Sequence, residues 1–275
     1  MLSPKSILLH LDSSPQAEQR IRMARHVAEV FNAQVTALYC ITTALLRYPF
    51  ALEGAATALS MMDELDKEAK KSAQAMFEKA CAGSSRLKWS ESKNATGATW
   101  EFIRRAFYAD LLILGQQEEG HFLNEELPFD FLTNVLIQSG RPALIVPYVG
   151  FNNPVAQTIL LAWKPTREAA RAVSAALPWL YQAKNVHLVC YGTEPKLPLG
   201  ALSVFLKAHG ISAILHQGGS DSVHAGEHLL SLAADVQADL LVMGCYGHTR
   251  ARQWVFGGVS HSVLRAMTVP VLMVH

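Results

Sequence analysis

The sequence predicts an α/β protein made of two consecutive doubly wound domains, each with a five-stranded parallel sheet. Short apolar runs alternate along the chain with helical patterns of about a dozen residues or more, which is typical of βαβ units. The order of these elements also occurs twice, and its clearest repeat is ADLLILG at residues 109–115 and ADLLVMG at residues 238–244. Such a repeat indicates two copies of one domain.

Each copy supplies the same elements in the same order. The expected strands of the first copy are at residues 6–12, 34–40, 87–92, 109–115 and 141–146. Those of the second copy are at residues 158–164, 185–191, 211–215, 238–244 and 269–274. The first strand of each copy leads into a helix rich in Ala and Arg, at residues 16–31 and 167–182. The first copy also has an extra stretch, in which charges at helical spacing predict an amphipathic helix over residues 61–79.

A polar joint containing proline, at residues 151–154, separates the two copies. We therefore expect a first domain at residues 1–150 and a second at residues 154–275. The apolar final strands of the two copies predict that the domains pair with each other, and that chains associate further as a homodimer.

Composition excludes several classes of protein. Half of the residues are hydrophobic and 17% are charged, which is typical of a well-buried sheet. The net charge of +1 gives no electrostatic basis for binding nucleic acid or an anionic membrane. No uncharged run is long enough to span a membrane, and the N-terminal apolar stretch is too short for a signal peptide. The four cysteines are widely spaced and form no CxxC motif, so we expect reduced thiols in a cytoplasmic protein.

The strongest functional signal is a set of glycines at positions 244, 247, 257 and 258, between an expected strand and an expected helix. Glycine lets backbone N–H groups approach phosphate oxygens without a Cβ in the way, and a helix N-terminus attracts anions. The pattern therefore predicts a nucleotide phosphate at the helix that begins near Gly258. Neither a Walker A loop nor a Gly-x-Gly-x-x-Gly motif is present, so the common dinucleotide sites are not indicated.

With these features the chain resembles the universal stress protein family in its tandem two-domain form. The Gly-x2-Gly-x9-Gly spacing at positions 244, 247 and 257 carries the resemblance, together with the ADLLVMG run before it and PVLMV at residues 270–274. The resemblance covers nearly the whole chain, twice. It implies a flavodoxin-like (Rossmann-like) strand order and an ATP site in the second domain, with AMP or ADP as alternative ligands and Mg²⁺ as an optional companion ion.

The resemblance also assigns residues to that site. The end of the first strand and Tyr191 would border the adenine, Met243 and the first two glycines would line the ribose and phosphates, and residues 257–260 would cradle the phosphates. His248 either touches a phosphate or stays in solvent. The implied binding residues are Ala162, Trp163, Lys164, Tyr191, Met243, Gly244, Gly247, His248, Gly257, Gly258, Val259 and Ser260.

Two positions in the second domain depart from the family pattern. Gly258 stands where the family usually has Ser or Thr, and Lys164 stands where it usually has Asp. Backbone donors at residues 258–260 and the Ser260 hydroxyl could still hold a phosphate. Lys164 either reaches a phosphate or stays solvated.

The first domain departs further. Asp12 matches the family's first-strand aspartate, but Glu118 replaces the second motif glycine and residues 127–130 contain no glycine. Acidic side chains repel phosphates, and bulky residues prevent close backbone approach. We therefore expect no ATP in the first copy, which would act as a structural or regulatory partner.

Two smaller signals have bland alternatives. His224, Glu227 and His228 match a His-x-x-Glu-His zinc pattern, but no third ligand follows at the expected spacing, so a chance match on a surface helix is favoured and no metal is expected. Cys245 is either a redox-sensitive thiol or a small residue packed beside the loop.

Three functions remain open at this point. No Ser/His/Asp set or paired carboxylates indicate a catalytic site, so an enzyme is not expected beyond slow ATP hydrolysis. The leading hypothesis is an ATP-binding stress-response protein that uses nucleotide occupancy of its second domain to set its conformation or partners. The alternative is a protein-interaction scaffold that binds no nucleotide, in which the glycines only shape a turn.

Overall fold

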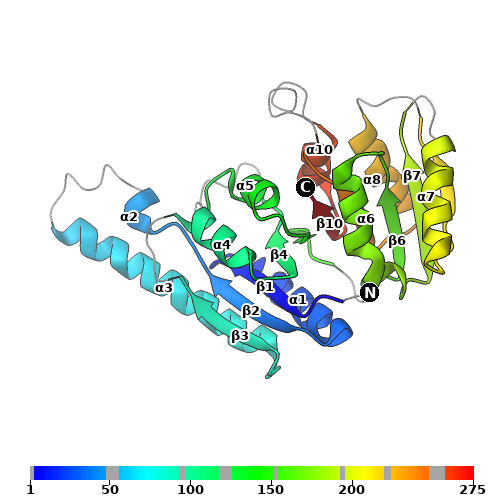
Figure 1. Ribbon diagram of the computed structural model, residues 1–275. Coiled ribbons are helices and arrows are strands. Elements are labelled where there is room, and N and C mark those ends of the chain that lie inside the picture. Colours follow the sequence, from blue (N-terminus) through cyan, green and yellow to red (C-terminus); the bar gives the residue numbers. More distant parts are fainter. Residues whose placement is uncertain are drawn as a thin grey trace. The chain divides into compact units, whose positions relative to one another are not determined.

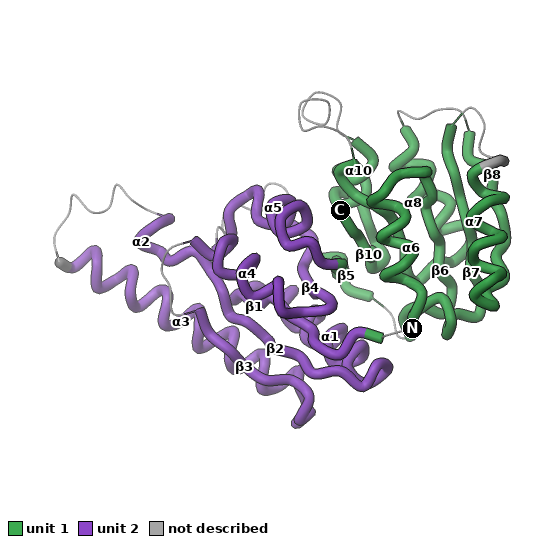
Figure 2. The backbone as a smooth tube through the Cα atoms, viewed as in Figure 1, with its two compact units in different colours: residues 1–3, 142–275 green, residues 4–141 purple. Residues whose placement is uncertain are grey.

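The computed structural model describes residues 3–47, 56–92, 97–117, 126–151, 154–192, 196–219, 224–247 and 258–275. The chain divides into two compact units, shown in different colours in Figure 2. The N-terminal unit contains Pro4–Arg141, and the C-terminal unit contains Pro142–His275 together with Met1–Ser3. Each unit combines a sheet with helices that connect its strands (Figure 1).

The N-terminal unit has a parallel sheet in the order β3-β2-β1-β4. Its strands are β1 (Ser6–Leu11), β2 (Gln34–Tyr39), β3 (Leu87–Glu91) and β4 (Leu111–Gly115). Its helices are α1 (Ala17–Phe31), α2 (Ala44–Arg47), α3 (Ala56–Cys81), α4 (Ala98–Ala106) and α5 (Phe131–Gln138).

The C-terminal unit has the order β5-β10-β9-β6-β7-β8, in which β5 is antiparallel to β10 and the other pairs are parallel. Its strands are β5 (Ala143–Val146), β6 (Thr158–Ala162), β7 (Asn185–Cys190), β8 (Ile214–Gln217), β9 (Leu240–Gly244) and β10 (Val271–Val274). Its helices are α6 (Arg167–Leu180), α7 (Lys196–Ala208), α8 (Ala225–Asp235) and α10 (Val259–Ala266).

The predicted α/β class and the doubled arrangement of strands and helices are confirmed. Five parallel strands, β8-β7-β6-β9-β10, form the second copy, and the first four strands of the first copy have the matching order. The apolar final strands of the two copies, β5 and β10, pair directly. Contacts therefore group β5 with the C-terminal unit, one strand away from the expected boundary at residue 150, which stays a prediction.

The repeated aspartate has the same task in both units. The Asp110 carboxylate accepts hydrogen bonds from the N–H groups of Lys5 (2.8 Å) and Ser6 (3.0 Å). The Asp239 carboxylate accepts them from Gln157 (2.9 Å) and Thr158 (3.1 Å). Each aspartate thus ties the start of one central strand to the start of its neighbour, which explains its place in the repeat.

The strand order positions a site in each unit. In both sheets the first strand lies between its second and its fourth, so the direction of the connections reverses at β1 in one unit and at β6 in the other. Because right-handed crossovers in opposite directions put helices on opposite faces, ligands in such sheets bind at the carboxyl ends of the strands beside this point. Within the described residues, no helix has the length and apolar character needed to span a membrane.

Candidate functional site

At the switch point of the C-terminal unit, the end of β9 lies against the first turn of α6. A Cβ added to Gly244 would lie 2.5 Å from the backbone nitrogen of Ala169 and 2.7 Å from the carbonyl carbon of Glu168. Both distances are too short for any side chain, and both atoms belong to a helix backbone that cannot move alone. Glycine at position 244 is therefore required by the close packing of β9 on α6.

The second motif glycine faces a charged side chain. A Cβ on Gly247 would lie 2.9 Å from Oε2 of Glu168, which is only 3% exposed. Packing against the backbone of α6 thus requires Gly244, whereas Gly247 meets only the end of a side chain that can move. These two glycines alone do not require a ligand.

Glu168 is an ionised carboxylate held at the start of α6. Burial raises the pKa of Glu168, but hydrogen bonds from Arg167, from its own backbone N–H and from Thr166 hold that pKa below its ordinary value. Thr166 also caps the helix by accepting a hydrogen bond from the N–H of Ala169 (3.3 Å). The sequence analysis did not single out Glu168, because an acidic residue in the first turn of a helix is normally solvated there.

The N-terminus of α10 lies on the other side of the same loop. Gly258 precedes the helix, and the N–H groups of residues 258–260 have no acceptor within the helix because they begin it. The Ser260 hydroxyl accepts a hydrogen bond from the N–H of Tyr246 (3.2 Å), which joins the loop to the helix. That hydroxyl keeps its own proton to donate.

The residues expected to border the adenine lie at the ends of β6 and β7, and Met243, expected beside the ribose, lies in β9. The backbone N–H of Trp163 donates to the carbonyl of Val189 (2.7 Å), so β6 and β7 stay paired up to this point. The indole Nε1 of Trp163 is buried and has no hydrogen-bond partner within the described part of the chain. Tyr191 is half-buried, with its ring 6.2 Å from that of His228. Met243 is buried and Ala162 and Lys164 are more accessible, whereas His248 and Gly257 lie outside the described residues.

The two smaller signals have the following geometry. The rings of His224 and His228 lie 6.5 Å apart, and the described residues contain no group of three His, Cys, Asp or Glu side chains that could hold a metal. Cys245 is 1% exposed, and burial together with the charge of Glu168 raises its pKa to about 12. This environment favours the packed cysteine over the reactive thiolate.

Comparison with known proteins relates the C-terminal part of the chain to one family. The sequence model of the Universal stress protein family matches residues 206–275. A universal stress protein of Synechocystis sp. is 43% identical over 49 residues, which is 18% of this chain and 17% of that protein. The crystal structure of a universal stress protein from Archaeoglobus fulgidus covers 98% of this chain and 95% of its own, with a TM-score of 0.74 and 18% identity. Residues 206–275 thus resemble the universal stress protein family, and the whole chain has the fold of one solved member.

Because the Archaeoglobus match spans both halves, it gives the whole chain the fold of this family; at 18% identity it says nothing of a ligand. A universal stress protein solved in complex with cAMP covers 44% of this chain at 24% identity, with a TM-score of 0.36. What this protein binds has to be argued from its own residues.

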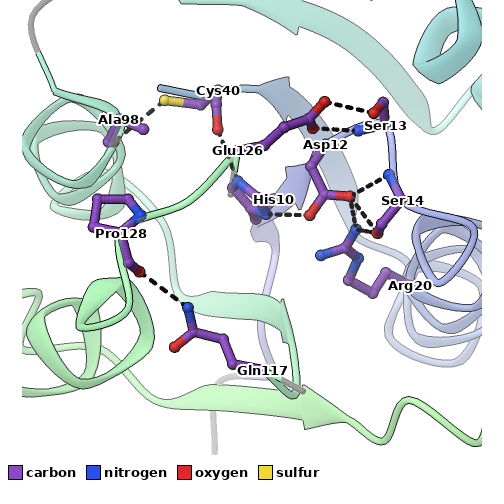
Figure 3. A network of polar contacts seen from close by, with 10 residues as sticks. All are labelled: His10, Asp12, Ser13, Ser14, Arg20, Cys40, Ala98, Gln117, Glu126 and Pro128. Carbon is purple, nitrogen blue, oxygen red and sulfur yellow. Dashed lines mark hydrogen bonds and ion pairs between the residues drawn. The ribbon is translucent and has the colours of Figure 1, made fainter. Parts of the chain in front are cut away.

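The equivalent position in the N-terminal unit is built differently (Figure 3). Asp12, at the end of β1, accepts hydrogen bonds from Nη2 of Arg20 (2.5 Å) and from the backbone N–H of Ser14 (3.0 Å). Both Asp12 and Arg20 are buried. Burial raises the pKa of Asp12, but Arg20 outweighs this effect and holds that pKa well below its usual range. The Arg20 guanidinium also lies beside Gly115, the counterpart of Gly244, where a Cβ would be 2.9 Å from Nη1.

A second carboxylate fills the same edge of the N-terminal unit. Glu126 accepts hydrogen bonds from the backbone N–H (2.8 Å) and the hydroxyl (2.5 Å) of Ser13, while its carbonyl accepts one from the N–H of Thr42 (2.7 Å). Figure 3 shows Glu126 and Arg20 on two sides of the β1–α1 turn. The chain's own side chains thus use the polar groups that a ligand would need. This supports the expectation of no nucleotide in this unit, through residues other than Glu118, which lies outside the described part.

Proposed function

We propose that this chain is a universal stress protein and that it binds an adenine nucleotide in its C-terminal unit, with a phosphate at the N-terminus of α10. The observation that carries the proposal is the set of backbone N–H groups at residues 258–260, which begin a helix beside the switch point of the sheet. The helix dipole adds positive potential there, and Gly258 presents no side chain to a phosphate.

Residues at the ends of β6 and β7 support a base in the same site. Trp163 offers a buried indole N–H, and Tyr191 a half-buried ring, within reach of the strand ends where an adenine would lie. The candidate nucleotides are ATP, which the sequence pattern indicates first, and AMP and ADP. We place the protein in the cytoplasm as a homodimer, with nucleotide occupancy setting its conformation or partners in a stress response.

One observation favours a second candidate, an interaction scaffold that binds no nucleotide. Gly244 is required by the packing of β9 on the backbone of α6, so the first motif glycine has a structural reason that involves no ligand. The two candidates differ only in what the N-terminus of α10 does.

Two substitutions at the first residue of α10 separate them. Val259 is the first residue of the helix, where proline is tolerated, and the extended ψ of 163° at Gly258 suits a following proline. Val259→Pro removes one N–H donor, while Val259→Ala shortens the same side chain and keeps the donor. Since a hydrogen bond to a charged group contributes about 1.5–3 kcal/mol, we expect Val259→Pro to weaken nucleotide binding at least about tenfold.

The measurement is isothermal titration with ATP and AMP, together with mass spectrometry of nucleotide released from the purified protein. Binding that is weakened in Val259→Pro but kept in Val259→Ala would support the proposal. A protein that carries no nucleotide and ignores both added ligands would instead support the scaffold.

A further inference from the structure

We infer that Glu168 sets how many phosphate groups the C-terminal site accepts, so that a nucleoside monophosphate binds more tightly than ATP. The inference rests on the proposed function, because it concerns the ligand of that same site. It assigns Glu168 as a specificity-determining residue.

The first step is the position of the carboxylate. Oε2 of Glu168 lies 2.9 Å from the point that a Cβ of Gly247 would occupy. The preceding residue, Tyr246, donates its N–H to the Ser260 hydroxyl in the first turn of α10. Of two consecutive residues, Tyr246 therefore contacts the first turn of α10 and Gly247 lies against Glu168.

The second step is the imbalance of charge around Glu168. Its side chain is 4% exposed, whereas that of Arg167, which donates Nε to the carboxylate, is 74% exposed. The cation is thus screened by solvent, while the anion faces the protein. The charge of Glu168 also reaches the loop, since it contributes to the raised pKa of Cys245.

The third step concerns the ligand. The N-terminus of α10 offers N–H donors for one phosphate group. AMP has one such group and ATP has three, and each added phosphate brings negative charge near a carboxylate that solvent screens poorly. At an effective dielectric of about 20, repulsion between such like charges lowers affinity about tenfold or more.

The test compares AMP, ADP and ATP by isothermal titration without Mg²⁺, in the full chain and in three variants. Glu168→Gln keeps the shape of the side chain and removes its charge, and we expect it to raise ATP affinity about tenfold and AMP affinity less. Arg167→Gln removes the partly compensating cation and should widen the preference for AMP. Glu227→Gln is the matched control, because Glu227 is an exposed carboxylate in the first turn of α8.

The outcomes separate this inference from the proposed function. If neither the unchanged protein nor Glu168→Gln binds any of the three nucleotides, the proposed function and the inference are both overturned. Equal affinities for AMP and ATP that neither Glu168→Gln nor Arg167→Gln changes would overturn only the inference. The titrations are repeated with Mg²⁺. If Mg²⁺ makes ATP bind more tightly than AMP, and Glu168→Gln abolishes this effect, Glu168 is a metal ligand and the inference is overturned. Arg167→Gln keeps the test decisive if Glu168→Gln does not fold.

Discussion

The two units share a frame and differ at the edge where a ligand would bind. Asp110 and Asp239 fasten the starts of the central strands with the same pairs of hydrogen bonds. At the carboxyl ends, Asp12 in one unit is neutralised by Arg20, eight residues further along. In the other unit the corresponding positions hold Lys164 and Ala172. One edge is therefore saturated by a buried ion pair, and the other is left with a glycine loop and a helix N-terminus.

This contrast shows that the same glycine of a repeated motif can be required by different neighbours in the two units. Gly115 and Gly244 occupy the same place in the repeat, but a Cβ on the first would meet a side chain and a Cβ on the second would meet a helix backbone. The glycine alone does not reveal whether a unit binds a ligand. The side chains that enter the switch point from α1 or α6 decide it.

The largest expected effect comes from breaking the buried pair of the N-terminal unit. Arg20→Ala leaves the Asp12 carboxylate buried without its cation, which costs about 3–5 kcal/mol of stability. Hydrogen exchange of the β1 amides during urea titration measures the loss, and the β6 amides of the same protein serve as an internal reference.

Arg171→Ala is the control for this prediction. Arg171 is an exposed arginine on α6 whose Nη1 donates to the carbonyl of His275 (3.0 Å), so its loss should change stability by less than about 1 kcal/mol. If Arg20→Ala is no more damaging than Arg171→Ala, the ion pair does not hold the N-terminal edge together.

Much of the frame could be predicted because it has a local signature. Apolar runs placed β4 and β9 correctly, since strands buried on both faces are almost continuously hydrophobic. Arg20 and Glu168 could not be recognised in this way. Each lies on a helix with charged neighbours, where a charge is solvated by default, and only the packing of the helix against a strand end buries it.

Contacts between residues far apart in the sequence could not be predicted either. Ser13 and Glu126 are 113 residues apart, and nothing in either local sequence marks them as partners. The sequence did indicate that the N-terminal unit lacks a nucleotide site, but it suggested Glu118 and the absence of glycine as the cause. The described contacts support the same expectation through Arg20 and Glu126 instead.

A second prediction uses pH to separate the units. His10 is fully buried between Phe102 and Phe131, its Nε2 donates to the carbonyl of Cys40 (2.9 Å), and burial lowers its pKa from 6.5 to about 4. Below pH 6.5 the His10 imidazole is protonated in the unfolded chain but stays neutral in the folded unit, so stability falls as pH drops from 6.5 to about 4. For His10 alone the loss reaches about 3 kcal/mol.

Denaturation of His10→Gln at several pH values checks this slope. The variant should be less stable at neutral pH, but its stability should fall much less as the pH is lowered. The remaining fall includes the smaller contributions of His26 and His187, whose pKa values burial also lowers. Asp12 adds little in this window, because its ordinary pKa is 3.8, whereas Glu168, whose pKa is lowered from 4.5, adds a loss below about pH 5 that both histidine variants keep. The exposed His261 provides the control, and a slope that His261→Gln and His10→Gln leave equally steep would rule out His10 as its source.

The smallest expected difference lies between the two glycines. Gly244→Ala forces a Cβ against the backbone of Ala169, so α6 must shift, and the cost should be near the upper end of the roughly 1–3 kcal/mol seen for overpacked sites. Gly115→Ala meets the end of the Arg20 side chain, which can turn slightly, and the reduced freedom of the unfolded chain recovers about 0.4–1 kcal/mol. Hydrogen exchange of β9 and β4 measures the two costs separately. Equal losses would mean that Arg20 is held as rigidly as a helix backbone, which would make the ion pair, and not only the glycine, the fixed element of the N-terminal edge.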